Sequence, residues 1–173
     1  MAPPACILTV MTWTQDRIVT DHIVLRAHDD RDKPTLVSLH ADPVVRRYLG
    51  GPVDETVLEA IRQADVGTQW GSFCVAVAGT DEAIGICSFN RDRGDLEISY
   101  QLLPEWTGRG YATEAAAAAI NWAWSHTDDP SMIAVTQTAN QRSLALLHRL
   151  GFVEEPTFEE FGANQSQLRL SRS

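Results

Sequence analysis

Apolar residues dominate three consecutive segments in the middle of the chain, which span residues 72–78, 83–90 and 96–103. Each segment has the length and the β-branched and aromatic content of a strand. Only short turn-forming stretches separate them, and such links join antiparallel neighbours. In the third segment, Glu97 and Ile98 begin an alternation of polar and apolar side chains. The two sets therefore face opposite sides of the predicted sheet.

Further strand and helix patterns flank this meander. Strands are predicted at 22–27, 132–136, 152–155 and 167–170, and helices over about 29–41, 42–49, 54–66, 110–125 and 140–150. The helix that follows the meander is the natural parallel crossover to the next strand. The order of elements predicts an α+β fold with a mixed, largely antiparallel central sheet of about seven strands flanked by helices.

The chain is predicted to form one domain over residues 18–173, with residues 1–17 as an N-terminal tail or extension. No repeat, linker or shift in composition divides the 173 residues. Whether Met1 or Met11 is the native start stays open. No apolar run approaches the ~20 residues that span a bilayer, so no membrane partner is expected.

Charge and cysteine content narrow the function classes. The formal net charge is −9, which argues against nucleic acid as a partner because phosphate binding needs a basic surface. The three cysteines form no CxxC pair, and their number suits a reducing cytoplasm. The histidines lack HExxH or Cys/His ligand spacing, so no metal is expected.

A glycine turn before the long helix carries the strongest chemical signal. Gly108 and Gly110 let the backbone turn tightly and approach a ligand. The first turn of the helix offers free amides and a positive dipole end, which attract phosphate. Arg109 adds a cation, and the Thr113 hydroxyl can donate to a phosphate oxygen. By itself, this pattern fits an ordinary loop and helix start equally well.

Two other phosphate-binding motifs are excluded. The P-loop pattern GxxxxGK[ST] is absent. The dinucleotide fingerprint GxGxxG fails because Thr113 stands where its last glycine would be. The preceding strands also form a meander rather than a βαβ unit.

Several segments resemble one family. EISYQLLPEWTGRGYATEA is similar to the signature of GNAT acetyltransferases, in particular the branch related to the RimJ/RimL N-terminal acetyltransferases. TGRGYA resembles the family pattern Q/R-x-x-G-x-G/A, from which Thr107 departs. TANQRSLALLHRLGF, the opening DHIVLRAHDDRDKPTLVSLHADPVVRRYLGGP and the ending GFVEEPTFEEFGANQSQLRL are also similar to this branch. The resemblance extends from about residue 20 to residue 170.

The resemblance implies a GNAT fold and transfer of acetyl from acetyl-CoA to an amine by direct attack in a ternary complex. It implies that the amides of Leu102 and Leu103 bind pantetheine and polarise the thioester carbonyl, and that Asn140 bonds the pantetheine arm. The pyrophosphate would be held by the amides of Gly108, Arg109, Gly110, Tyr111 and Ala112.

The resemblance also suggests catalytic candidates. Glu97 or Glu160 would take the amine proton, although Glu97 also fits an exposed strand carboxylate. Glu160, with the neighbouring Glu159, also fits a solvated acidic segment. Ser143 would protonate the departing thiolate, because Leu147 stands where many GNAT enzymes have a tyrosine. An ordinary helix-end serine is its alternative.

Two functional readings remain open. The first is an active N-acetyltransferase whose acceptor is a protein N-terminus or a small amine. The second is a catalytically inactive GNAT-fold module that binds CoA as a sensor or scaffold. The resemblance further suggests a homodimer.

Overall fold

The computed structural model describes residues 16–173. Its strands are β1 (Ile18–Val19), β2 (Ile23–Arg26), β3 (Ser72–Val77), β4 (Ala83–Asn90), β5 (Leu96–Leu102), β6 (Ser131–Gln137), β7 (Val153–Glu154), β8 (Phe158–Glu160) and β9 (Ala163–Ser171). Its α-helices are α1 (Lys33–Ala41), α2 (Glu55–Gln63), α3 (Tyr111–His126) and α4 (Gln141–Arg149). Short 3-10 helices lie at η1 (Asp30–Asp32), η2 (Val45–Tyr48) and η3 (Pro104–Trp106).

These strands form one sheet in the order β1-β2-β3-β4-β5-β6-β9-β7, and β8 pairs with β9 outside that path. All pairs are antiparallel except β5 with β6. The predicted α+β class, meander and helical crossover are confirmed. The sheet has nine strands in the described part rather than about seven, because the two- and three-residue strands β1 and β8 are too short to give a periodic signal.

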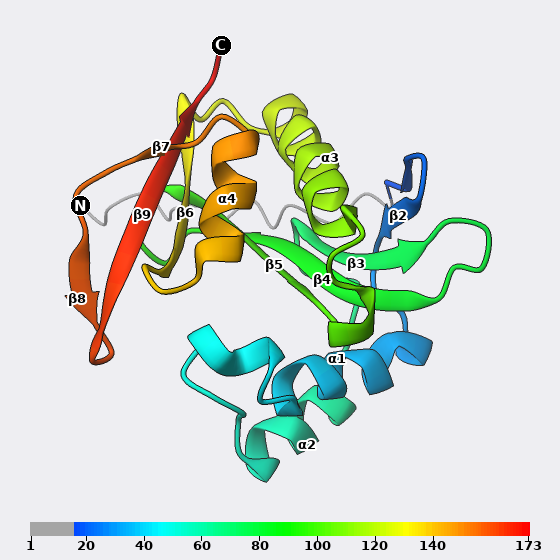
Figure 1. The fold of residues 1–173 in the computed structure, drawn as a ribbon. Coiled ribbons are helices and arrows are strands. Elements are labelled where there is room, and N and C mark those ends of the chain that lie inside the picture. The colour runs from blue at the N-terminus through cyan, green and yellow to red at the C-terminus, as the bar shows by residue number, and fades with distance from the viewer. Residues whose placement is uncertain (1–15) are drawn as a thin grey trace, which may run out of the picture.

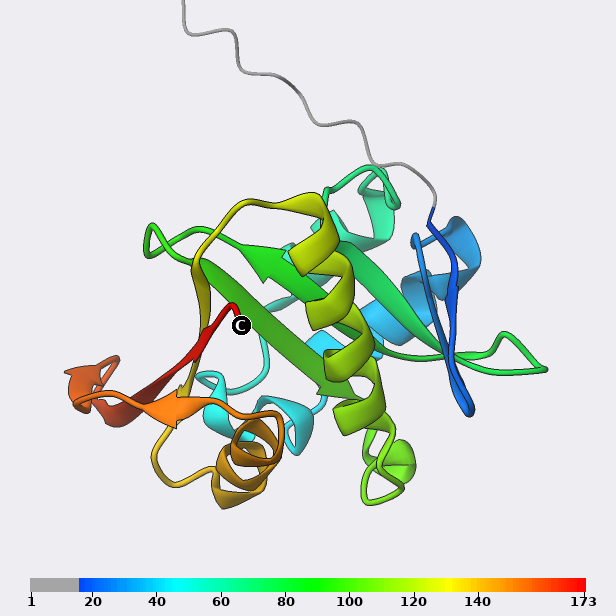
Figure 2. The ribbon, with the colours of Figure 1, turned by 90° about the horizontal axis from the view of Figure 1, so that it is seen from above.

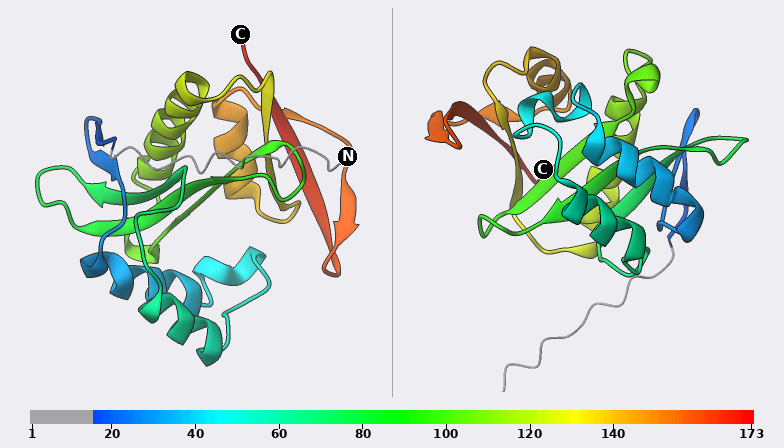
Figure 3. Two further views of the ribbon diagram at one scale, coloured as in Figure 1. Left: turned by 180° about the vertical axis from the view of Figure 1, so that it is seen from behind. Right: turned by 90° about the horizontal axis from the view of Figure 1, so that it is seen from below.

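The helices cover both faces of the sheet. Helices α1 and α2 lie on one face, and α3 and α4 lie on the other (Figures 1 and 3). Seen from above, α3 runs across the middle of the sheet, with α4 on one side and the β1–β2 hairpin on the other (Figure 2). The sheet is therefore enclosed between two helical layers, as the burial of an α+β core requires.

Aromatic packing anchors α3 to the sheet. Its inner face is a row of small residues, including the fully buried Ala116 and Ala119, which lets the helix lie close to the strands. The ring of Trp122 then packs edge-on against Phe73, with 4.9 Å between ring centroids, and stacks near Phe89 at 6.4 Å. Burying such large rings contributes strongly to core stability.

The N-terminal part of the chain is described only from Asp16 onward. The expected extension and the choice between Met1 and Met11 therefore lie outside the described residues, apart from Asp16 and Arg17. Asp16 accepts a hydrogen bond from the Trp122 indole nitrogen at 2.7 Å. Among the residues that the structure describes, no helix has the length and apolar character needed to cross a membrane.

A buried ion pair joins β2 to the 3-10 helix η1. Arg26 in β2 donates to both carboxylate oxygens of Asp32, at 2.7 and 2.9 Å, and also to Asp81 at 3.2 Å. Arg26 is 7% exposed and Asp32 is 2% exposed. Burial acts to raise the pKa of Asp32, but the hydrogen bonds from Arg26 and from the Asp29 amide lower it below the usual value. This bidentate pair fixes where the chain turns from β2 into α1.

Replacing Asp32 with asparagine should lower the free energy of unfolding by about 3 kcal/mol, because it leaves a buried guanidinium short of a charged partner. Urea denaturation measures the change. Asp30→Asn is the matched control, since Asp30 pairs with Lys33 at 2.8 Å but its side chain is 85% exposed. The control should lose less than about 1 kcal/mol. Equal losses in the two variants would contradict a special role for the buried pair.

Candidate active site

Strands β5 and β6 separate from each other after a very short pairing. The parallel register joins Leu96 to Met132 and Glu97 to Ile133, and no further pair of these strands is formed in the described structure. Both strands continue beyond this point, β5 to Leu102 and β6 to Gln137. Their remaining edges therefore face a splay in the middle of the sheet, and an extended ligand can bond to backbone groups there.

The backbone of β5 shows which of its amides faces the splay. The Leu103 amide donates to the Ile84 carbonyl of β4 at 2.9 Å. Successive amides of a strand point to opposite edges, so the Leu102 amide points toward the splay. Two amides were expected to bond pantetheine and the thioester. The Leu103 amide already has a partner in β4, so only the Leu102 amide remains a candidate.

The predicted glycine turn lies directly after β5, at the N-terminus of α3. Gly108 and Gly110 have φ values of 78° and 85°, which other residues rarely adopt. A Cβ built on Gly110 would meet no atom within 4 Å, so this glycine is required by conformation rather than by crowding. The first intrahelical donor is the Glu114 amide, which bonds to the Gly110 carbonyl. The amides of Tyr111, Ala112 and Thr113 precede it and are free to hold an anion.

Two arginines flank this turn. The Arg109 guanidinium lies 4.9 Å from the Trp106 ring centroid and donates to the Glu105 carbonyl. A Cβ on Gly108 would lie 3.9 Å from a guanidinium nitrogen of Arg142 in α4. The helix N-terminus and the two cations bring positive charge together at this turn, which is the environment that an anion such as a pyrophosphate requires. Which anion binds, and whether the Thr113 hydroxyl contacts it, stays a prediction.

Asn140 and Ser143 form the start of α4. The Asn140 side chain accepts from the Ser143 amide at 3.3 Å and donates to the Thr136 hydroxyl at 3.0 Å. Asn140 is thus the N-cap of α4. Both ends of its amide have partners within the protein, so its predicted bond to pantetheine would be an additional one.

The Ser143 hydroxyl bonds across to the sheet. Its Oγ lies 2.7 Å from the phenol oxygen of Tyr100 in β5. Tyr100 packs against the hydrophobic core under α3 and α4, and burial raises the pKa of its phenol to about 12. Tyr100 was not among the sequence candidates; the alternation along this strand only placed it with Ile98 and Leu102 on the face opposite Glu97. Only the tertiary structure brings its hydroxyl to Ser143.

The two candidate base residues share one arginine. Glu97 lies at the last residue pair before the splay. Arg93 in the β4–β5 turn lies 3.4 Å from the Glu97 carboxylate and 2.6 Å from the Glu160 carboxylate of β8. The Arg93 guanidinium also lies 5.4 Å from the Phe158 ring centroid. The structure therefore brings Glu97 and Glu160 together through a cation that the sequence analysis did not single out.

The environments of the two carboxylates differ. Burial raises the pKa of Glu97 above its ordinary value, although Arg93 opposes this shift. The hydrogen bond from Arg93 lowers the pKa of Glu160. A carboxylate whose pKa is raised by burial is the better proton acceptor of the two; the role of either residue as the base stays a prediction.

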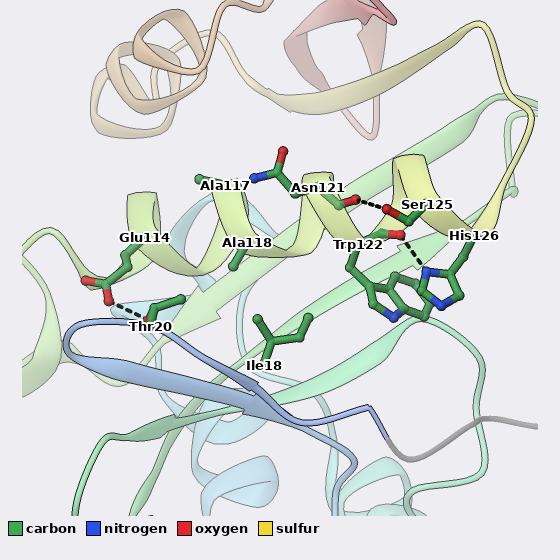
Figure 4. A pocket seen from close by; sticks show the side chains of 9 residues that line it. All are labelled: Ile18, Thr20, Glu114, Ala117, Ala118, Asn121, Trp122, Ser125 and His126. Atoms are coloured by element: carbon green, nitrogen blue, oxygen red, sulfur yellow. Dashed lines mark hydrogen bonds between the residues drawn. The ribbon is translucent and has the colours of Figure 1, made fainter.

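A separate groove lies on the other side of α3. It has a volume of about 560 Å³ and runs between β1 and α3. Ile18, Thr20, Glu114 and Trp122 are among the residues that line it (Figure 4). The Glu114 carboxylate is engaged by the Thr20 hydroxyl and by the His22 amide. The groove lacks the splay, the glycine turn and the candidate base, so it is not the candidate active site.

One group of metal-ligand residue types occurs among the described residues. Polar atoms of His28, Asp32 and Cys74, all buried, lie within 4.8 Å of one another. Sequence spacing did not reveal this group, because the residues come from separate elements. Arg26 already binds both Asp32 oxygens, and burial raises the pKa of the Cys74 thiol to about 12. A protonated thiol and a fixed guanidinium suit the ion-pair core and do not fit a cation.

A splayed sheet beside a helix N-terminus with free amides can hold an extended, phosphate-bearing ligand. The family model described as "Acetyltransferase (GNAT) domain" matches residues 22–153 of this chain. The chain therefore belongs to the GNAT acetyltransferases, and the resemblance seen in the sequence is confirmed.

A sequence relative supports the same assignment, and a solved structure shares the fold. The uncharacterized N-acetyltransferase p20 of Bacillus licheniformis is 26% identical over 88% of this chain and 91% of its own length. An acetyltransferase of Agrobacterium tumefaciens has the same fold, with a TM-score of 0.78 at 24% identity over 92% of this chain and 96% of that chain.

Two further solved structures of the same fold carry named activities. The spermidine N-acetyltransferase of Vibrio cholerae, in complex with CoA and spermine, gives a TM-score of 0.70 at 19% identity, over 86% of this chain and 95% of that chain. An acetyltransferase of Salmonella typhimurium that modifies the N-terminal serine of ribosomal protein L7/L12 gives a TM-score of 0.69 at 17% identity, over 90% of this chain and 98% of that chain. The structural neighbours also include RimL, a ribosomal L7/L12 N-acetyltransferase.

Replacing Gly110 with valine should abolish binding of acetyl-CoA, because the side chain would enter the space in front of the helix amides. Isothermal titration calorimetry measures the affinity. Gly79→Val is the matched control, since Gly79 has a φ of 89° and its Cβ would also meet no atom within 4 Å. Both variants bear similar backbone strain, but only the first should lose affinity. Unchanged affinity in Gly110→Val would overturn the assignment of the turn.

Proposed function

We propose that the protein is an acetyl-CoA-dependent N-acetyltransferase that moves acetyl to a primary amine by direct attack in a ternary complex. The observation that carries the proposal is the position of Glu97. It lies at the point where β5 and β6 separate, and the glycine turn follows at the far end of the same strand. A donor whose phosphates bind at the turn and whose arm follows β5 would present its acyl group near Glu97.

The residues around the splay have separate tasks in this proposal. The amides of Gly108, Arg109, Gly110, Tyr111 and Ala112 bind the pyrophosphate, with the side chains of Arg109, Arg142 and Thr113 beside them. The Leu102 amide and the Asn140 side chain bond the pantetheine arm. Donors held in fixed positions stabilise developing charge without reorganising.

Glu97 is the proposed base. An ammonium group has no lone pair, so the acceptor must lose a proton before or during attack. The raised pKa of Glu97 suits this task, because a stronger base takes a proton more readily. Glu160 lies on the opposite side of Arg93 and adds negative charge that attracts a cationic acceptor. Ser143 is the proposed proton donor to the leaving thiolate.

The acceptor is proposed to be a small amine or a protein N-terminus. The structural neighbours include proteins named for each of these substrates. The net charge of −9 favours approach of a cation over approach of an anion. Cys74 and Cys87 are free and buried, which accords with a proposed cytoplasmic location. A homodimer is proposed on the family resemblance.

The purified protein, given acetyl-CoA and a panel of amines that includes spermidine and a peptide with an N-terminal serine, should release free thiol. Glu97→Gln should lower kcat/KM by about 10²–10⁴-fold, the usual contribution of a general base. Glu82→Gln is the control, because Glu82 is an exposed carboxylate in the β3–β4 turn. Binding of acetyl-CoA without acetylation of any amine would favour the inactive CoA-binding module instead.

Arg93→Gln should move the acidic limb of the kcat/KM profile to higher pH. Arg93 lowers the pKa of Glu97, while burial and the carboxylates of Asp92 and Glu160 raise it. When the guanidinium is removed, only the groups that raise the pKa of Glu97 remain. Glu97 is then protonated at a higher pH than in the wild type.

Arg91→Gln is the matched control for this profile. Arg91 lies in the same turn but pairs with Asp129 at 2.5 Å instead of with Glu97. Its profile should match that of the wild type. A shift of the Arg93→Gln limb to lower pH, or no shift, would contradict the assignment of Glu97 as the titrating base.

A further inference from the structure

We propose that Tyr100 is a positioning residue that sets the direction of the Ser143 hydroxyl, so that the Ser143 proton points at the leaving sulfur. This inference rests on the proposed function and adds to it a second member of the proton-donating group. The geometry that carries it is the 2.7 Å bond between the Tyr100 phenol and Ser143 Oγ, which joins β5 to α4 beside the splay.

The two partners are held rigidly from opposite sides. Tyr100 packs against the core and lies three residues beyond the last β5–β6 pair. Ser143 is in the first turn of α4, where the Asn140 cap fixes its backbone amide and Thr136 fixes the cap. Neither residue needs to reorganise for the two oxygens to meet, which is the condition for a preorganised donor.

The direction of the hydrogen bond follows from acidity. A phenol is a much stronger acid than an aliphatic hydroxyl, so the stable arrangement has Tyr100 donating and Ser143 accepting. The high pKa of the buried phenol keeps it protonated at neutral pH. With its oxygen accepting from Tyr100, the Ser143 hydroxyl must direct its own hydrogen elsewhere. It also becomes a better donor, because chained hydrogen bonds polarise one another.

Backbone carbonyls compete with the splay for the Ser143 proton when the Tyr100 hydroxyl is absent. Serine hydroxyls in helices commonly donate back to a carbonyl three or four residues earlier. In α4 these carbonyls belong to Asn140 and Ala139, and they already accept the amides of Leu144 and Gln141. A bond of this kind would turn the Ser143 proton into the helix and away from the splay. Tyr100 stabilises the other rotamer.

The reaction step balances with these groups alone. The amine nitrogen forms the C–N bond, the C–S bond breaks, and its electron pair stays on sulfur. The Ser143 proton passes to sulfur, the Tyr100 proton passes to Ser143 Oγ, and a solvent water returns a proton to the phenolate and becomes hydroxide. The proton that the amine loses goes to Glu97, which releases it to this hydroxide, so the net transfer is one proton from nitrogen to sulfur. No oxidant, metal or further co-reactant is required.

The experiment compares Tyr100→Phe, Ser143→Ala and the double variant. We expect kcat to fall by about 10²-fold in Ser143→Ala, the effect of losing one preorganised donor. In Tyr100→Phe we expect a fall of about tenfold with the KM for acetyl-CoA within about twofold, because an interaction made chiefly in the transition state is lost. The double variant should match Ser143→Ala within about twofold, since Tyr100 acts only through Ser143.

A second readout does not depend on turnover. The pKa of the CoA thiol in its binary complex can be followed by the ultraviolet absorbance of the thiolate. Hydrogen-bond donation to sulfur stabilises the thiolate, so this pKa should rise in Tyr100→Phe and in Ser143→Ala. Tyr48→Phe and Ser125→Ala are the matched controls, because Tyr48 lies in η2 beside Arg47 and Ser125 bonds to the Asn121 carbonyl in α3.

The outcomes test the positioning role of Tyr100 and the proposed function separately. A raised thiol pKa in Ser143→Ala but not in Tyr100→Phe would overturn the positioning role. Additive losses of kcat in the double variant would overturn it as well. A wild-type protein that binds CoA but releases no thiol would overturn the proposed function, while the thiol pKa would still test the hydrogen-bond chain. Thermal unfolding confirms that each variant is folded.

Discussion

The short parallel pairing of β5 with β6 is the constraint on which the arrangement of this protein depends. Two residue pairs hold the strands together at Leu96 and Glu97, and the helix that connects the strands forces them to run in the same direction. Beyond Glu97 the strands separate, so the backbone of β5 keeps one edge unpaired inside an otherwise continuous sheet. Such an edge is costly unless a ligand or another element bonds to it.

The glycine turn and helix α4 lie at different sides of this unpaired edge. The glycine turn places helix amides at its outer end, and the capped start of α4 approaches it from the side. The hydrogen bond between Tyr100 and Ser143 joins β5 to α4. On the opposite face of β5, the half-buried Glu97 meets Arg93 and, through it, Glu160. The proposed acid and the proposed base thus lie on the two faces of one strand, because successive side chains of a strand alternate.

Stability and function are supplied by different parts of the molecule. The buried pair of Arg26 and Asp32, with both residues less than a tenth exposed, fixes the turn from β2 into α1. The aromatic group around Trp122 fixes α3 on the sheet. The groups of the candidate site are more exposed and carry opposing charges, so their protonation can respond to a substrate without unfolding the core.

The sequence by itself determined the meander, the crossover helix, the glycine turn and the family, because local periodicity and the conformational freedom of glycine act over a few residues. It also identified Glu97, Glu160 and Ser143 as candidates. Only the tertiary structure decided that Arg93 links the two carboxylates and that the Leu103 amide is taken by Ile84. It also brought Tyr100 to Ser143, 43 residues away. These contacts depend on strand register and helix placement, which no local pattern encodes.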